Sequence, residues 1–235
     1  MSHHLIREIE HLKKSILGLG ALVEENLHKA LEALESGNCT LAREVISTDP
    51  AIDEYEVEVE EEVLKILALH QPVAGDLRFI MAVAHIDNEL ERIGDLSANI
   101  CARTIELARE ARIAIPHTML QMARRIELLL GKTLDALVQR DVALARRVLA
   151  EDREVDELFA RLLGELKQAI REDIERLDSL IIVFTVARYL ERMADRMTNI
   201  CEAVIYMVEG EIVRHQDPSA VDELLERELG TTREL

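Results

Sequence analysis

Acidic side chains at helical spacing are the residues of this sequence with the clearest capacity for chemistry. Glu91, Asp95 and Asn99 stand four residues apart, which places all three along one face of an α-helix. Their carboxylates and amide form an oxygen-rich stripe, in which carboxylates one turn apart repel each other by about 0.2–0.5 kcal/mol. A cation bound between them removes this repulsion, so the stripe is a candidate metal site.

The same stripe occurs a second time in the chain. Residues 90–101 read LERIGDLSANIC and residues 190–201 read LERMADRMTNIC, with seven of twelve positions identical. The second copy supplies Glu191, Asp195 and Asn199 at the same spacing. Packing alone favours similarity at apolar positions, whereas much of what these segments share is polar. The repeat therefore strengthens the interpretation of both stripes as metal sites.

A second pair of matching segments supplies further carboxylates. Residues 41–54 match residues 144–157 at seven of fourteen positions, and the identical positions include Asp53 and Asp156. In each half this segment falls on the predicted helix that precedes the stripe. Asp49 lies one turn before Asp53, and Asp152 one turn before Asp156, so we expect these two pairs to form the second wall of the two sites.

The donor atoms decide which ions these sites suit. Carboxylate and amide oxygens favour Mg²⁺, Ca²⁺, Mn²⁺ or a carboxylate-bridged iron cluster. Zinc is less well matched, because no set of Cys and His has the spacing of a zinc site. Asp87 extends the first stripe by one turn but its counterpart is Ala187, so the two sites need not be identical. The alternative is a solvated helix face without metal, with Arg92 and Arg192 in surface ion pairs.

Helical patterns account for nearly the whole chain. Between Leu5 and Val23, apolar residues recur at alternating spacings of four and three, which is typical of a packed amphipathic helix. Breaks at Gly37, residues 71–75 and Pro116 separate the helical segments. The predicted helices cover residues 5–36, 40–69, 76–111, a stretch that begins near 119, 141–171 and 177–209, with a short tail helix from 218 to about 230.

These elements predict an all-α fold of two tandem three-helix bundles followed by a short C-terminal helix. Nine glycines and four prolines leave little material for the turns of an all-β protein. The expected domains are residues 1–113, 114–215 and 216–235. Within the second helix we expect an irregularity, with Asp49 as an N-cap and Pro50 as the first helical residue.

Composition excludes several classes of function. With 28 Lys and Arg against 46 Asp and Glu, the net charge of −18 argues against nucleic acid and anionic lipid as partners. The longest apolar stretch, residues 180–187, is too short to span a bilayer. Three scattered cysteines and the lack of a signal peptide indicate a reducing compartment. We therefore expect a cytoplasmic protein.

Enzyme signatures are missing from the sequence. It contains no phosphate-binding glycine loop, no dinucleotide fingerprint, no nucleophile elbow and no H-E-x-x-H. Two Glu-x-x-His patterns, which begin at Glu8 and Glu25, lie 17 residues apart on one predicted helix, so they cannot share a di-iron site. We therefore expect a protein without catalytic activity.

The repeated L-E-R-x-x-D-x-x-x-N-I, on the third helix of each half, resembles the motif of the PhoU family of phosphate-transport accessory proteins. The most specific segments are residues 87–95 and 188–195, and the resemblance covers nearly the whole chain. It implies metal ligands, often of multinuclear iron clusters, at Glu91, Asp95, Glu191 and Asp195, with Asp53, Asp156, Asn99 and Asn199 as neighbours.

The resemblance also implies a regulatory function. PhoU-like proteins restrain phosphate uptake and phosphate-starvation signalling, as adaptors between the ATP-binding subunit of the phosphate ABC importer and a sensor histidine kinase.

The apolar face of the first helix is widened by Leu22, Leu27 and Leu31, so we also expect a homodimer. Two alternatives remain. One is a carboxylate-bridged metalloprotein that stores metal or catalyses a reaction, and the other is a structural helical adaptor without metal.

Overall fold

The computed structural model describes residues 3–109 and 113–213, and over these ranges it contains six long α-helices and no strand. The elements are α1 (His3–Ser36), α2 (Cys39–His70), α3 (Ala74–Leu107), α4 (His117–Gln139), α5 (Val142–Glu172), the short 3₁₀ turn η1 (Ile174–Arg176) and α6 (Leu177–Glu209). The prediction of an all-α fold is confirmed.

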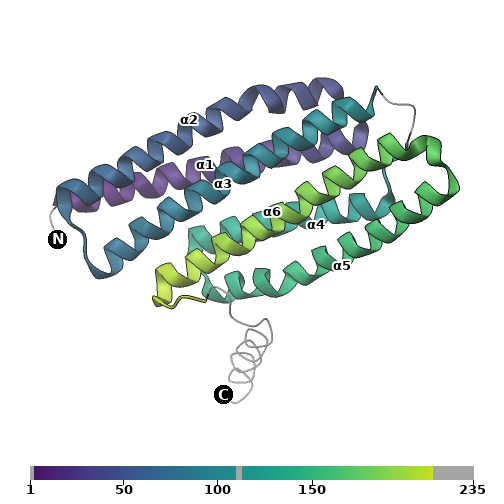
Figure 1. The fold of residues 1–235 in the computed structure, drawn as a ribbon. Coiled ribbons are helices and arrows are strands. Elements are labelled where there is room, and N and C mark those ends of the chain that lie inside the picture. The colour runs from purple at the N-terminus through teal and green to yellow at the C-terminus, as the bar shows by residue number, and fades with distance from the viewer. Residues whose placement is uncertain (1–2, 110–112, 214–235) are drawn as a thin grey trace, which may run out of the picture.

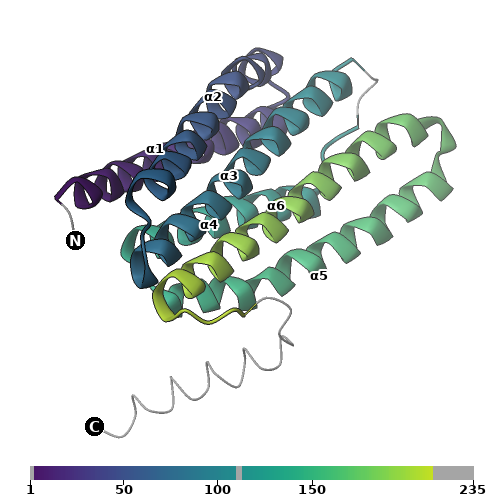
Figure 2. The ribbon, with the colours of Figure 1, turned by 60° about the vertical axis from the view of Figure 1, so that its left-hand side comes forward.

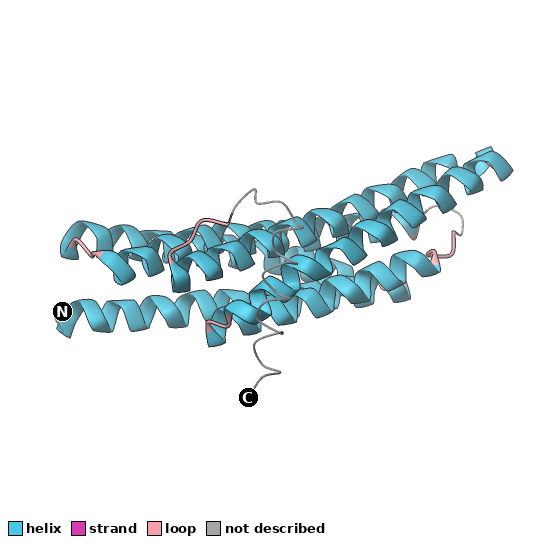
Figure 3. Cartoon of the chain, turned by 90° about the horizontal axis from the view of Figure 1, so that it is seen from below, coloured by secondary structure: helices cyan, strands magenta, loops and turns pink. Residues whose placement is uncertain are grey.

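The helices form two three-helix units that lie side by side (Figure 1). In the first unit α1, α2 and α3 pack on one another, and α4, α5 and α6 do the same in the second. Between the units α3 packs along α6, and α1 packs against α4. Figure 2 shows α3 and α6 as neighbours from a second direction, and Figure 3 shows the elongated bundle from below. The predicted tandem arrangement is therefore present.

One continuous apolar core holds the two units together. The predicted seam of α1 is buried from Leu5 to Val23 and contributes to this core. The same cluster of buried side chains includes residues of all six helices, among them Ile86 of α3 and Val186 of α6, both fully buried. Burial at this periodicity explains why these segments are helical, since most helix stability in proteins comes from packing of an apolar face.

Local signals fix several helix ends where the sequence predicts them. Gly37 adopts a φ of 67°, a left-handed conformation that glycine takes without steric cost at the end of α1. The side chain of Asn38 caps α2 by accepting hydrogen bonds from the backbone N–H groups of Thr40 and Leu41 at 3.0 and 3.2 Å. α6 begins and ends at the predicted residues.

The predicted irregularity in the second helix is wrong. α2 runs without interruption from Cys39 to His70, and Pro50 lies inside it. Proline has no N–H to offer the carbonyl one turn earlier, so a break is the usual outcome. Here Val45 and Ile52 are buried on either side of the proline, and their packing keeps the helix continuous. Asp49 is therefore a mid-helix side chain and caps nothing.

Two further expectations concern the ends of the units. α3 ends at Leu107, a few residues before the predicted residue 111. The predicted tail helix from 218 to about 230 lies outside the described residues. The proposed boundaries of the three domains stay a prediction.

Candidate metal centres

The first candidate metal centre lies between α2 and α3. Asp53 projects from α2, and Glu91 and Asp95 project from successive turns of α3. Each offers one carboxylate oxygen, and these three oxygens lie within 4.8 Å of one another. Because Mg²⁺ and Ca²⁺ bind oxygens at about 2.0–2.6 Å, ligand oxygens around one ion stand up to about 5 Å apart. The three predicted residues therefore converge at a spacing that fits a cation.

Glu91 is the most strongly perturbed member of this trio. Its Oε2 atom is buried and has no hydrogen-bond partner. The Nε of Arg92 lies 3.4 Å away, an ion pair without hydrogen-bond geometry. Burial, followed by the charge of Asp95, raises the pKa of Glu91 to about 7, and Arg92 offsets this only in part. A half-buried carboxyl with a raised pKa and no hydrogen bond to its buried oxygen is a candidate for a binding site.

Asp49 adds a fourth carboxylate to the first centre. It lies one turn before Asp53 on α2, and its Oδ1 is buried without a hydrogen-bond partner. Burial, then the charges of Asp95 and Asp53, raise the pKa of Asp49 to about 6. Asp49 is expected from the sequence to lie beside Asp53 in the second wall, with capping as its alternative role, and it is not among the predicted metal residues. The signal that identifies it is its match to Asp152 in the repeat.

The second candidate metal centre lies at the equivalent place between α5 and α6. Burial, followed by the charges of Asp156, Asp195 and Glu191, raises the pKa of Asp152 to about 6. The Oε2 of Glu191 is buried without a hydrogen-bond partner, and Arg188 lies 3.8 Å from it. Four carboxylates again face one another, although among the described residues only the first centre brings three ligand oxygens within 4.8 Å.

The two asparagines predicted as neighbours of the centres have different surroundings. Asn99 is exposed, one turn beyond Asp95. Asn199 is half-buried and donates a hydrogen bond from Nδ2 to Oε2 of Glu89 at 3.2 Å, across the packing of α6 on α3. The same oxygen accepts a hydrogen bond from Arg196 at 3.2 Å. The amide of Asn199 is thus engaged between the two units.

Comparison with known proteins gives the same two-unit division. The family model described as the PhoU domain matches this chain twice, over residues 16–104 and 119–204. The chain belongs to the PhoU family. Each of the two PhoU domain matches contains one of the candidate metal centres.

Known PhoU proteins are similar to this chain over most of its length. The phosphate-specific transport system accessory protein PhoU homolog of Aquifex aeolicus is 39% identical over 212 residues, which are 90% of this chain and 96% of the relative. The accessory protein PhoU of Escherichia coli is 32% identical, over 93% of this chain and 90% of its own.

Solved PhoU structures share the fold described above. The crystal structure of PhoU from Pseudomonas aeruginosa has a TM-score of 0.83 at 32% identity, and covers 87% of this chain and 99% of its own. The phosphate transport system regulatory protein PhoU from Streptococcus pneumoniae has a TM-score of 0.82 at 31% identity, over 89% and 99% of the two chains.

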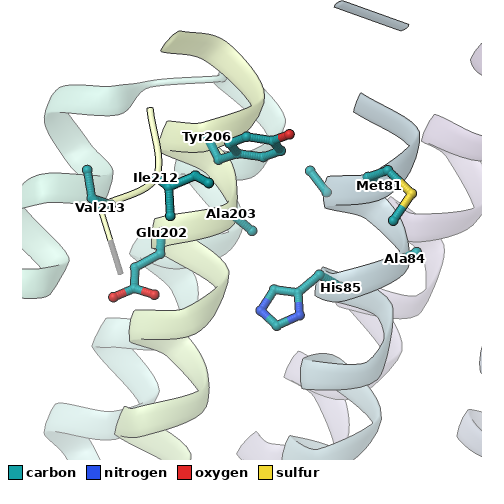
Figure 4. Close-up of a pocket in the computed structure, with 9 residues that line it drawn as sticks. Met81, Ala84, His85, Glu202, Ala203, Tyr206, Ile212 and Val213 are labelled. Carbon is teal, nitrogen blue, oxygen red and sulfur yellow. The ribbon is translucent and has the colours of Figure 1, made fainter. Parts of the chain in front are cut away.

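A cavity of about 500 Å³ lies at the PhoU bundle surface, between α3 and α6 (Figure 4). Met81 and His85 line it from α3, Tyr206 lines it from α6, and Ile212 and Val213 close one side. The sequence alone does not predict this cavity, because it forms between residues more than one hundred positions apart.

In the part of the chain that the structure describes, no helix is long and apolar enough to cross a membrane.

Proposed function

We propose that this chain is a regulatory accessory protein of a phosphate-specific transport system and restrains phosphate uptake and starvation signalling. The main support for the proposal is that the similarity to PhoU proteins extends over nearly the whole chain. The chain spans 96% of a relative that is named as a phosphate-specific transport system accessory protein, at 39% identity, and both PhoU domain copies are present. A negative regulator of this kind acts through contacts with other proteins.

As partners we propose the ATP-binding subunit of the phosphate ABC importer and the cytoplasmic part of a sensor histidine kinase, with this chain as a cytoplasmic homodimer. Its net charge of −18 suits basic surfaces on such partners, because complementary charge accelerates and orients association. Long, rigid helical faces are suitable docking surfaces, since little ordering entropy is lost on binding.

We further propose that both centres bind metal. The residues fit such ions: buried, unpartnered oxygens occur in both centres, on Asp49, Glu91 and Glu191, and every donor is a carboxylate. Hard divalent ions or carboxylate-bridged iron suit such donors. The ligands would come from Asp49, Asp53, Glu91 and Asp95 in the first centre, and from Asp152, Asp156, Glu191 and Asp195 in the second. A bound ion would neutralise these carboxylates and offer open positions to an anionic group.

The experiment that tests the regulatory proposal is a binding measurement paired with a cellular one. We expect the purified chain to bind the ATP-binding subunit and the kinase fragment, and a strain without it to express phosphate-starvation genes in phosphate-rich medium. Normal repression in that strain, together with no binding to either partner, contradicts the proposal. Light scattering at micromolar concentration tests the homodimer.

The role of metal is tested separately with Glu91→Gln/Asp95→Asn/Glu191→Gln/Asp195→Asn, which removes charge and keeps side-chain shape. We expect this variant to hold less metal than the wild type by mass spectrometry and to bind partners more weakly. Unchanged partner binding would leave a structural adaptor in which metal has no role. Redox or hydrolytic turnover by the wild type, lost in the variant, would instead support a metalloenzyme.

A further inference from the structure

A buried carboxylate next to the first metal centre has no partner. Asp87 on α3 is only 2% exposed, and its Oδ1 has no hydrogen-bond partner. Burial of an ionised carboxylate is costly unless a cation or hydrogen-bond donors compensate it. Such a side chain in the interior of a helix pair therefore requires an explanation beyond packing.

Carboxylates of α2 and α3 lie around Asp87. It lies one turn before Glu91 on α3, while Glu56 and Glu60 lie one turn apart on α2, beyond Asp53. Because α2 packs on α3, the two rows face each other. Burial, followed by the charges of Glu56, Glu60 and Glu91, raises the pKa of Asp87 to about 8. These glutamates therefore act on Asp87 from both helices, although among the described residues only the oxygens of the first centre come within 4.8 Å of one another.

In the second unit, the positions equivalent to these acids hold apolar residues. In the repeat, the counterparts of Glu56, Glu60 and Asp87 are Phe159, Leu163 and Ala187. Ala187 is fully buried in the apolar core, and the ring of Phe159 packs 6.3 Å from that of Phe184. The fold thus accepts apolar side chains here, so the architecture does not require the acids of the first unit.

We propose that the first unit carries an additional divalent-cation site, formed by Asp87 with Glu56 and Glu60, which the second unit lacks. The inference extends the metal-binding part of the proposed function and rests on it. Asp87 supplies a buried ligand, while Glu56 is half-buried and Glu60 is exposed. The ion therefore enters from the solvent side and keeps water in part of its coordination shell, as Mg²⁺ and Mn²⁺ usually do in proteins.

A titration of the full chain with Mn²⁺, followed by electron paramagnetic resonance of the free ion, tests this site. The background variant is Asp156→Asn/Glu191→Gln/Asp195→Asn, which removes the second centre. In this background we expect Asp87→Asn to bind about one Mn²⁺ fewer per chain, with the remaining binding unchanged. Asn has the shape of Asp, and circular dichroism confirms that each variant is folded.

The matched control separates this site from the first centre. In the same background, Asp53→Asn/Asp95→Asn removes ligands of the centre and leaves Asp87 intact. We expect that variant to retain the Mn²⁺ that Asp87→Asn loses. If Asp87→Asn binds as much Mn²⁺ as its background, the inference is overturned and Asp87 is a buried protonated acid. If the wild type binds no Mn²⁺, the metal part of the proposed function fails too, and partner binding is unaffected by that result.

Discussion

The side-chain amide of Asn199 on α6 donates a hydrogen bond to the carboxylate of Glu89 on α3 at 3.2 Å, although the residues are 110 positions apart. Glu89 is 5% exposed, and Arg196 donates to the same oxygen. The Oε2 atom of this buried carboxylate is thus compensated from the other unit, while His85 of its own helix lies 3.9 Å from Oε1. The two units are joined by polar contacts as well as by their apolar core.

Removal of that amide should destabilise the protein. We expect Asn199→Ala to lower the free energy of unfolding by about 1–3 kcal/mol, because Glu89 then loses a donor while buried. Urea unfolding in the presence of chelator measures the change. Asn99→Ala is the matched control in the first unit. Asn99 is exposed, so its loss should change stability by no more than about 0.5 kcal/mol. Equal effects of the two substitutions would contradict the assigned contact.

The close approach of α2 and α3 beside the first centre depends on Gly94. A Cβ atom there would lie 2.9 Å from Cδ1 and 3.2 Å from Cγ2 of Ile52, which is fully buried. We expect Gly94→Ala to push the helices apart, to cost about 1–3 kcal/mol of stability and to weaken metal binding at the first centre.

The control for Gly94 is Gly164 in the interior of α5, where an added Cβ meets nothing within 4 Å. There Gly164→Ala should stabilise the protein by about 0.5–1 kcal/mol, since alanine favours helix. Thermal melting and Mn²⁺ titration of both variants give the comparison. Destabilisation by both substitutions to the same extent would show that helix spacing is not the cause.

Stability of the metal-free protein should depend on pH through the carboxylates of the centres. Folding raises the pKa of Asp49 and Asp152 to about 6, that of Glu91 to about 7 and that of Asp87, beside the first centre, to about 8. Between about pH 4.5 and 8 the folded chain therefore binds more protons than the unfolded chain, and the free energy of unfolding falls as pH rises. Urea midpoints with chelator at pH 5.5 and 8 measure this slope.

Two controls isolate the centres in that experiment. The carboxamide variant at Glu91, Asp95, Glu191 and Asp195 should flatten the slope. His28, whose pKa is raised chiefly by a hydrogen bond to Glu127, and Asp87 contribute with the same sign and remain in the variant. Mn²⁺ added at pH 8 should raise the midpoint of the wild type more than that of the variant, which keeps the proposed site at Asp87. A midpoint that rises from pH 5.5 to 8 would contradict the assigned shifts.

The proline inside α2 is expected to weaken the helix that carries Asp49 and Asp53. Pro50→Ala restores an N–H that can bond to the carbonyl of Ile46, and removes the clash of the ring with that turn. We expect a gain of about 1–3 kcal/mol in the free energy of unfolding. Chemical denaturation measures it, with Ala51→Gly as a control that weakens the same exposed turn. A loss of stability in Pro50→Ala would mean that the core around α2 requires the backbone conformation that the proline imposes.

Much of the fold could be predicted because it depends on local patterns. Apolar periodicity and turn residues place α6 to the residue, and the repeat pairs the acidic positions of the two halves. The continuous α2 could not be predicted, since packing of Val45 and Ile52 overrides the local signal of Pro50. The burial of Asp87 and the hydrogen bond from Asn199 to Glu89 could not be predicted either, because they depend on which helices become neighbours.

The core that runs through all six helices has a consequence for cooperativity. Either half on its own would expose to water the apolar surface that α3 and α6 now cover in each other. The duplicated PhoU domain is therefore a unit of sequence that contains one candidate metal centre, whereas the unit of folding is the whole pair. A single unfolding transition reports on both halves at once, so an ion bound in one half also protects the other against unfolding.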